Sequence, residues 1–369
     1  MIYLDHNATA PVKPAVAEAV SAALGVCGNP SSAHGAGRTA RRLVEDGREA
    51  VAALVGAKAE RVVFTAGGTE ANNLALRGSG RTRILAGATE HPSVLKAVDG
   101  VEVIPVHRDG RLDLDALDSL LSKKGAPSLV SVMLANNETG VIHPVAEVAS
   151  IAKRHGALVH CDAAQAPGRI AFDMASLGVD LLTVSAHKLG GPMGAGALVL
   201  GPGIDIESIL RGGGQERRRR AGTENVPAIA GFGAAAALAQ NDTDNAPRLA
   251  RLRDLLEARV SEEGAVVFGS AAARLPNTAC IAMPGVASDT QVMGFDLSGF
   301  AVSSGSACSS GKVEPSHVLA AMGVSESEAR TAIRVSLGWS TTDAEVEAFI
   351  GAWTALHRRL GARASAAAA

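Results

Sequence analysis

Between residues 51 and 200, short apolar runs alternate repeatedly with turns and helical segments. Each run is almost continuously apolar, which is typical of strands whose two sheet faces are both covered by helices. The runs, with the turns that follow them, are RVVFTAGGTEANNLAL, TRILAGATEHPSV, SLVSVMLANNETG, GALVHCDAAQ and DLLTVSAHKLGG. The pattern predicts an α/β fold with a mostly parallel sheet. Polar residues gather directly after the strands, at the sheet edge where such folds bind ligands.

The segment QNDTDNAPRLARL interrupts this pattern and leads into an amphipathic helix. We interpret it as the crossing from a large domain, residues 12–244, into a smaller α/β domain, residues 245–369. Residues 1–11 are expected to pack with the smaller domain. A length of 369 residues is sufficient for two such units, each with its own core.

The bulk composition argues against several classes of protein. The net charge of −2 gives no reason to expect nucleic acid or a membrane surface as partner. The longest helical apolar run, residues 229–239, is too short to span a bilayer and is predicted to be a buried helix. The sequence does not begin with a signal-peptide pattern, which favours the cytoplasm. Four scattered cysteines without a C-x-x-C pair predict free thiols and no metal site.

Two charged residues follow neighbouring strands of the predicted sheet. Lys188 comes after LLTVSAH and before a glycine-rich stretch, and Asp162 ends the strand LVHCD. A lone lysine of this kind is most often a solvent-exposed residue. An aspartate and a lysine at two strand ends, however, suit pyridoxal phosphate. The lysine can bind this cofactor covalently, and the aspartate keeps its pyridine nitrogen protonated.

A phosphate group needs donors of its own. The stretch TAGGTEANN places Gly68 and Thr69 at the start of a predicted helix. Helix N-termini favour anions, and the Thr69 hydroxyl can donate a hydrogen bond. A plain strand-to-helix turn explains the glycines equally well, and the lack of a G-x-G-x-x-G pattern argues against a dinucleotide. Ser185 and His187, beside Lys188, can supply further donors.

The segment SSGSACSSG, residues 303–311, surrounds Cys308 with small residues. Cys161 and Cys280 lie in apolar strands, where a cysteine is usually a buried hydrophobic residue. No such pattern surrounds Cys308, so the same interpretation does not fit it. We expect residues 303–313 to be poorly ordered, because they offer few buried contacts.

An ordered series of motifs along nearly the whole chain resembles the NifS/IscS-type cysteine desulfurases. These are fold-type I pyridoxal-phosphate enzymes within the class V aminotransferase family. In chain order the motifs are YLDHNATAP, GNPSSAHGAGR, VVFTAGGTEANNLAL, TEHPSVL, ANNETG, HCDAAQ, SAHKLGGPMGAGAL, GGGQERRRRAGTEN, SSGSAC and IRVSLG. The resemblance implies the same fold, with a large cofactor-binding domain and a smaller α/β domain that carries the cysteine loop.

The resemblance also implies roles around the cofactor. Lys188 would hold the cofactor and move the substrate Cα proton, and Asp162 would pair with the pyridine nitrogen. Gln165 would hydrogen-bond the ring oxygen, and His91 would stack on the ring face. The implied phosphate ligands are Gly68, Thr69, Ser185 and His187, with Thr223 reaching over from the neighbouring subunit of a homodimer.

For the substrate, the resemblance implies that Arg334 and Asn137 bind the carboxylate of L-cysteine. The arginine fork suits a carboxylate better than lysine would. The thiolate of Cys308 would take the substrate sulfur as a persulfide, and L-alanine would be released. The sulfur would pass to an acceptor, such as an iron–sulfur scaffold protein, for cluster assembly or other sulfur transfer. The acidic segment 201–208 and the short stretch after HRRLGARAS depart from relatives that dock partners there, so the acceptor stays open.

Other interpretations also stay open at this point. A selenocysteine lyase would have a similar pocket, and a class V aminotransferase needs no loop cysteine. A non-enzymatic assembly scaffold is a further alternative, against which the intact Lys188, Asp162 and Cys308 argue. The run of arginines at 217–220 could suit nucleic acid. It adjoins the AGTEN motif, however, which favours a subunit interface or the rim of the pocket.

Overall fold

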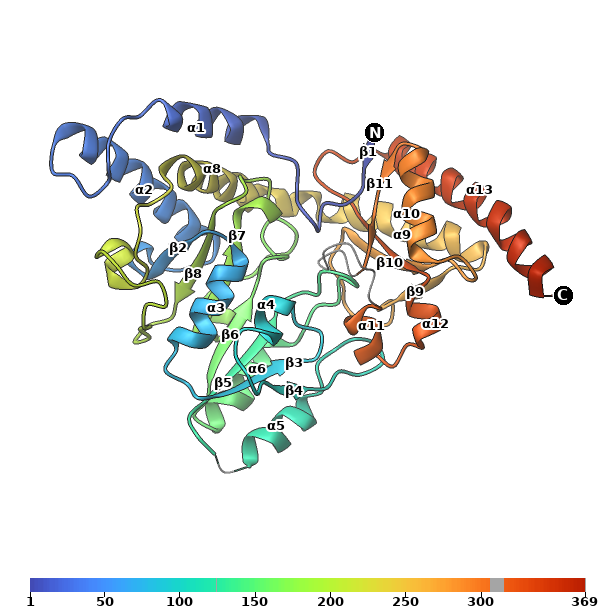
Figure 1. Cartoon of the computed structure of the whole chain (residues 1–369), viewed down its shortest axis with the longest axis horizontal. Coiled ribbons are helices and arrows are strands. Elements are labelled where there is room, and N and C mark those ends of the chain that lie inside the picture. Colours follow the sequence, from blue (N-terminus) through green and yellow to red (C-terminus); the bar gives the residue numbers. More distant parts are fainter. Residues whose placement is uncertain (124, 306–314, 369) are drawn as a thin grey trace.

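The computed structural model describes residues 1–123, 125–305 and 315–368, and the side chains up to residue 360. The chain forms two lobes, each built around its own sheet (Figure 1). Cys308 and most of the segment that we expect to be poorly ordered lie outside the described residues.

The large lobe contains the predicted α/β sheet, and the fold class is confirmed. Its seven strands lie in the order β2-β8-β7-β6-β5-β3-β4. The pairs along the run from β4 to β7 are parallel, whereas β8 is antiparallel to both of its neighbours. The strands are β2 (Val62–Thr65), β3 (Arg83–Gly87), β4 (Glu102–Ile104), β5 (Ser128–Met133), β6 (Leu158–Asp162), β7 (Leu181–Ser185) and β8 (Gly196–Leu200).

Helices cover both faces of this sheet, which explains the continuous apolar runs. Along β2, Val62 and Phe64 belong to one buried cluster and Val63 belongs to another, because alternate strand residues point to opposite faces. The first cluster includes residues of α1 (Pro14–Leu24), α2 (Gly35–Leu54), α6 (Val145–Arg154) and α8 (Val226–Asp242). The second includes residues of α3 (Gly68–Gly78) and α4 (Pro92–Leu95). The remaining large-lobe α-helices are α5 (Leu114–Ser122) and α7 (Met174–Leu177).

The small lobe has a four-stranded sheet in the order β12-β13-β10-β9 and a separate parallel pair, β1 and β11. A cluster that includes Leu252, Ile281, Val335 and Trp353 fills the space between this sheet and its helices. The strands are β1 (Ile2–Tyr3), β9 (Val266–Phe268), β10 (Thr278–Ala282), β11 (Phe300–Ala301), β12 (Ser303–Ser304) and β13 (Ala332–Ser336). The helices are α9 (Ala246–Glu262), α10 (Ser288–Leu297), α11 (His317–Ala321), α12 (Glu326–Ala329) and α13 (Asp343–Ala368).

A short 3-10 turn, η4 (Thr243–Asn245), joins α8 of the large lobe to α9 of the small lobe. One buried cluster reaches Ala239 of α8, and another includes Leu249 of α9. The exact division, including the assignment of residues 1–11, stays a prediction.

The segment after β1 runs from the small lobe to the large one (Figure 1). Leu4 is part of the small-lobe core, and Asp5 bridges to Ser336 of β13. Only a few residues later, the Ala10 N–H donates to the carbonyl oxygen of His187 in the large lobe. Residues 4–10 therefore tie the two lobes together beside Lys188.

The cysteines that the structure describes follow the sequence expectation where one was made. Cys161 and Cys280 are buried in strands, whereas Cys27 is exposed. In the described part of the chain, no helix is long and apolar enough to cross a membrane. Within those same residues there is no group of three or more side chains suited to hold a metal ion.

Candidate active site

A cavity of about 480 Å³ lies where the carboxyl ends of the large sheet meet the small lobe. Its lining includes every predicted site residue except Thr223 and Cys308. Thr223 is exposed and lies apart from the cavity, and Cys308 is outside the described residues. The predicted residues that line the cavity are Gly68, Thr69, His91, Asn137, Asp162, Gln165, Ser185, His187, Lys188 and Arg334.

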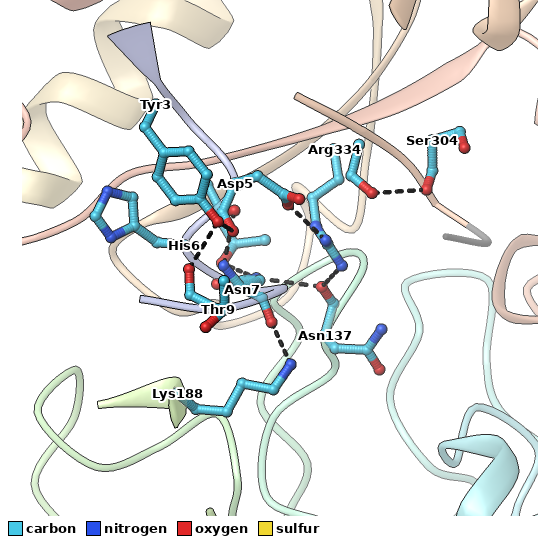
Figure 2. Close-up of polar contacts among 12 residues, drawn as sticks. Tyr3, Asp5, His6, Asn7, Thr9, Asn137, Lys188, Ser304 and Arg334 are labelled. Atoms are coloured by element: carbon cyan, nitrogen blue, oxygen red, sulfur yellow. Dashed lines mark hydrogen bonds and ion pairs between the residues drawn. The ribbon is translucent and has the colours of Figure 1, made fainter. Parts of the chain in front are cut away.

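The strand order explains why Lys188 and Asp162 lie in one cavity. Strands β6 and β7 are parallel neighbours, with Asp162 opposite Thr183. Lys188 ends a 3-10 turn, η2 (Ala186–Lys188), that continues directly from β7. Its Nζ donates to the backbone carbonyl oxygen of Asn7, which belongs to the segment between the lobes (Figure 2). The amine is therefore held at the edge of the cavity.

The Asp162 carboxylate is held by two donors. Asn72 Nδ2 donates to Oδ2 at 2.7 Å, and the Ala164 N–H donates to Oδ1 at 2.9 Å. The sequence did not lead us to predict Asn72 as a site residue. A signal was present, because Asn72 lies on the buried face of α3 between the core residues Ala71 and Leu74. A buried amide on an apolar helix face needs a polar partner, and here the partner is Asp162.

The same amide links Asp162 to His91. Asn72 Nδ2 also donates to Ser93 Oγ at 2.9 Å, and Ser93 Oγ lies 2.7 Å from His91 Nδ1. The Ser93 N–H donates to this Nδ1 as well, so the neutral ring carries its proton on Nε2. Burial lowers the pKa of His91, although the Asp162 carboxylate opposes this effect. His91 is thus a neutral aromatic base beside the cavity.

The end of the cavity near α3 has the features of an anion site. Helix α3 begins at Gly68 and has no side-chain cap, so its first N–H groups are available to a ligand. The turn packs tightly on β8, because a Cβ on Gly196 would lie only 2.6 Å from the carbonyl carbon of Gly67. Ser185 Oγ and His187 Nδ1 are buried and have no hydrogen-bond partner among the described residues.

Buried polar atoms without a partner are rare in native proteins. A phosphate would satisfy both Ser185 and His187, so the residues present fit this end of pyridoxal phosphate. Burial, together with Lys188 and Arg169, lowers the pKa of His187 to about 4, so its ring is neutral. A neutral imidazole with a proton on Nδ1 can donate to a phosphate oxygen.

Arg334 reaches the cavity from the small lobe. Its neighbours Ile333 and Val335 lie in the core, so Arg334 on β13 points to the other face of the sheet. Nη2 donates to Asp5 Oδ1 at 2.7 Å, and Nη1 donates to the carbonyl oxygen of Asn137 at 3.0 Å (Figure 2). Nε is buried and has no partner among the described residues. The orientation of the guanidinium is therefore fixed, and its Nε–H is still able to donate a hydrogen bond to a ligand.

Asp5 was likewise not predicted from the sequence as a site residue. Its only signal is its place in the YLDHNATAP motif, which does not indicate that it contacts a residue so far along the chain. Asn7 supports the same arrangement, since Asn7 Nδ2 donates to the Asn137 carbonyl oxygen at 3.2 Å. The substrate-facing arginine therefore depends on the segment between the lobes.

The loop that carries Thr223 has an unusual backbone. Glu216, Arg217 and Arg218 have φ values of 46°, 58° and 67°, in the left-handed region that non-glycine residues rarely adopt. Glu216 is buried and forms a two-bond ion pair with Arg48, with contacts of 2.7 and 2.9 Å. This ion pair fixes the strained turn, and Thr223 follows it on the surface.

With this geometry established, comparisons with known proteins place the chain in a family. The family model "Aminotransferase class-V" matches residues 2–349. The chain belongs to the class-V aminotransferase family. A cysteine desulfurase of Cereibacter sphaeroides is 45% identical over 368 residues, covering 94% of this chain and 93% of the relative.

Solved structures of this family agree. The X-ray structure of a NifS-like protein from Rickettsia africae has a TM-score of 0.90 and 38% identity, and the match covers 97% of this chain and 99% of that one. A structure of SspA in complex with cysteine has a TM-score of 0.79 and 28% identity, covering 91% and 99% of the two chains. The resemblance of this class-V family member to the NifS/IscS-type cysteine desulfurases is thereby confirmed.

Proposed function

We propose that the chain is a pyridoxal-phosphate-dependent cysteine desulfurase, which converts L-cysteine to L-alanine and moves the sulfur to Cys308. The observation that carries the proposal is one cavity in which Lys188, Asp162 and Arg334 meet, although they come from different lobes. The identity of 45% to a cysteine desulfurase over nearly the whole chain supports the same activity.

The residues present suit each part of the cofactor. Lys188 would bind it covalently, Asp162 would face the pyridine nitrogen, and Gln165 would face the ring oxygen. When bound, pyridoxal phosphate supplies an electron sink for the charge that develops on the substrate Cα. The neutral His91 would lie against the ring. The residues that would hold the phosphate are Gly68, Thr69, Ser185 and His187.

L-cysteine would bind with its carboxylate on Arg334 and Asn137. The Arg334 guanidinium is already oriented by Asp5 and by the Asn137 carbonyl oxygen, so little freedom is lost when a carboxylate binds. The SspA structure contains bound cysteine, which supports L-cysteine as the substrate here.

Lys188 would act as the base that moves the Cα proton, because its Nζ is held at the cavity edge beside Asn7. Cys308 would act as the nucleophile toward sulfur. In this step the carbon–sulfur bond of the substrate breaks and a sulfur–sulfur bond to Cys308 forms. The substrate carbon takes up a proton, so L-cysteine and the Cys308 thiol yield L-alanine and a Cys308 persulfide.

We further propose that the active form is a homodimer. Thr223 is exposed and follows a turn that Glu216 and Arg48 fix rigidly, so it is available to complete the phosphate site of a partner subunit. The persulfide sulfur would pass to an acceptor protein, such as an iron–sulfur scaffold, in the cytoplasm. These partners and this location follow from the family resemblance.

The decisive experiment is an assay of the purified protein loaded with pyridoxal phosphate. We expect L-alanine and sulfide from L-cysteine when a thiol reductant is present, and little sulfide without it, because the persulfide then stays on the enzyme. A protein that binds the cofactor but forms no alanine from L-cysteine would refute the proposal. Faster turnover of L-selenocysteine that persists in Cys308→Ala would instead favour a selenocysteine lyase.

A further inference from the structure

A buried arginine lies directly behind the cavity and has no role in the proposed reaction. Arg169 has only 7% of its surface exposed. Its side chain donates to Gln165 Oε1, to the Gln165 carbonyl oxygen at 3.2 Å, to the His6 carbonyl oxygen at 3.1 Å and to the Lys188 carbonyl oxygen at 3.3 Å. The guanidinium of Arg169 therefore contacts three segments beside the cavity, those that contain His6, Gln165 and Lys188.

All of these acceptors are uncharged. In the described part of the chain, Arg169 forms no ion pair with a carboxylate, unlike the buried Arg48 and the largely buried Arg274, which pair with Glu216 and Glu257. Burial and the charge of Arg334 lower the pKa of Arg169 to about 9, so the guanidinium stays charged at neutral pH. A buried charge without a counter-ion is costly, which makes a purely structural role for it a poor explanation.

The contact with Gln165 has a definite chemical consequence. Arginine can only donate, so the atom of the Gln165 amide that faces Arg169 must be the oxygen. The other end of the amide is then Nε2, which donates to the carbonyl oxygen of Asn7 at 3.0 Å. Both Gln165 and Asn7 line the cavity. Arg169 thereby turns the donor end of the amide toward the side on which Lys188 lies.

We propose that Arg169 is a positioning residue for the cofactor. It orients Gln165 so that Nε2 is presented to the ring oxygen, and its positive charge behind Lys188 disfavours protonation of the bound chromophore. The proposal rests on the proposed function, because it concerns the cofactor that Lys188 would hold. Burial is the main cause that lowers the pKa of both His6 and His187, and the charge of Arg169 adds to this effect on both rings.

The test is an absorbance titration of bound pyridoxal phosphate against pH, combined with the cofactor dissociation constant. The titratable and charged groups that line the cavity or the adjoining pocket around Arg169 are His6, His91, Asp162, His187, Lys188, Asp242 and Arg334. Arg169→Met removes the charge and frees the Gln165 amide to turn. We expect the midpoint of the chromophore titration to rise by about one pH unit.

Arg169→Lys keeps the charge but cannot reach all of the acceptors. We expect the titration midpoint of Arg169→Lys to shift by less than half of the shift in Arg169→Met. We expect its affinity for the cofactor to fall by as much as the affinity of Gln165→Ala falls. In the Gln165→Ala background, Arg169→Lys should cause no further loss of affinity, because Gln165 is the group through which that loss arises. The matched control is Arg274→Lys, which alters an arginine whose side chain is only 7% exposed and does not line the cavity, and which should leave the midpoint unchanged.

An unmoved midpoint in Arg169→Met, in a protein whose wild type binds the cofactor, overturns this inference alone. A wild type that binds no pyridoxal phosphate overturns the proposed function and the inference with it. If Arg169→Met does not fold, the cofactor affinity of Arg169→Lys is the test, and an affinity equal to that of the wild type overturns the inference. Additive losses of affinity for Arg169→Lys and Gln165→Ala would show that Arg169 does not act through Gln165.

Discussion

The two walls of the active-site cavity are built in different ways. The large-lobe wall consists of residues that directly follow parallel strands, such as Asp162 after β6 and Lys188 after β7. The small-lobe wall consists chiefly of Arg334, whose orientation is fixed by Asp5, a residue 329 positions away in the chain. The first wall follows from sheet topology, and the second depends on a contact between distant segments.

This difference separates two tasks. The residues that would hold the cofactor belong to the large lobe, whereas the guanidinium that would bind the substrate carboxylate belongs to the small lobe. Changes on the large-lobe wall should therefore affect cofactor retention. Changes on the small-lobe wall should affect substrate use while the cofactor stays bound. Four substitutions test the functions of the site, and one pH dependence tests the packing beneath the large-lobe wall.

The largest effect is expected on the large-lobe wall. Lys188→Ala should abolish covalent cofactor attachment and lower alanine formation by about a thousandfold or more, because the Cα proton loses its base. Absorbance spectra and a turnover assay measure the two effects, with Lys153→Ala, an exposed lysine on α6, as the control. A Lys188→Ala protein with the wild-type spectrum would contradict the proposed attachment site.

The next largest effect concerns Cys308, which lies in the sequence between β12 and α11. Cys308→Ala should retain the wild-type cofactor spectrum but lower alanine formation by about a hundredfold or more, because no thiolate takes the sulfur. Mass spectrometry after L-cysteine treatment should locate the persulfide on Cys308 in the wild type. Cys27→Ala, which removes an exposed thiol, should behave like the wild type. A persulfide on any other cysteine would refute the role of Cys308.

Arg334→Ala tests the small-lobe wall itself. Losing the charge-assisted hydrogen bonds to the substrate carboxylate should raise KM by about tenfold to a hundredfold. The cofactor dissociation constant should stay at the wild-type value. Arg330→Ala removes an exposed arginine from the same part of the chain and serves as the control. A cofactor loss as large as the change in KM would show that the two walls are not separable.

A smaller effect is expected from the amide that supports Asp162. Asn72→Ala leaves Asp162 Oδ2 without its donor and should weaken cofactor binding by about tenfold, with KM for L-cysteine unchanged at saturating cofactor. Fluorescence titration with pyridoxal phosphate gives the affinity, and the exposed Asn241→Ala is the control. An Asn72→Ala variant that changes KM alone would reverse the assignment of the large-lobe wall.

The smallest effect is a pH dependence of stability beneath the large-lobe wall. His160 on β6 is fully buried between Ser131 Oγ at 2.8 Å and Thr183 Oγ1 at 3.0 Å, and burial lowers its pKa from 6.5 to about 4. The unfolded chain therefore binds an extra proton between these two values. The free energy of unfolding should fall as the pH decreases from about 6.5 to 4, and this contribution is zero above that window.

His160→Gln tests that contribution, because glutamine does not titrate. Urea denaturation at several pH values gives the slope of the free energy of unfolding against pH. Between pH 6.5 and 4 this slope should be smaller for His160→Gln than for the wild type, by the equivalent of up to one bound proton. The comparison uses slopes, so a constant difference in stability between the two proteins does not matter. Equal slopes between pH 6.5 and 4 would show that His160 is not buried in its neutral form.

The sequence predicted the large-lobe wall better than the small-lobe wall for a physical reason. Apolar runs identify buried parallel strands, and parallel topology brings their carboxyl ends together, so the placement of Asp162 and Lys188 can be inferred locally. Arg334 was identified only through the resemblance, since an isolated arginine in a strand has many possible partners.

The supporting residues were missed because their partners are set by tertiary packing. Asn72, Asp5 and Arg169 each make contacts at sequence separations that no periodic pattern encodes. Of these, only Asn72 carried a readable signal, as a polar residue on a buried helix face. The roles of the site residues, the homodimer and the Cys308 persulfide stay predictions, and the experiments above test those of Lys188, Cys308 and Arg334.

The segment between the lobes also sets an order of events during synthesis. Asp5 and Asn7 leave the ribosome early, but their partners Arg334 and Ser336 follow 329 residues later. The large lobe can fold while the chain is still growing, since its sheet ends at Leu200. The carbonyl oxygen of Asn7 can be locked beside Lys188 by the small lobe only after nearly the whole chain has emerged. Completion of the active site should therefore be among the last steps of folding, and a stalled chain would lack a finished site for L-cysteine.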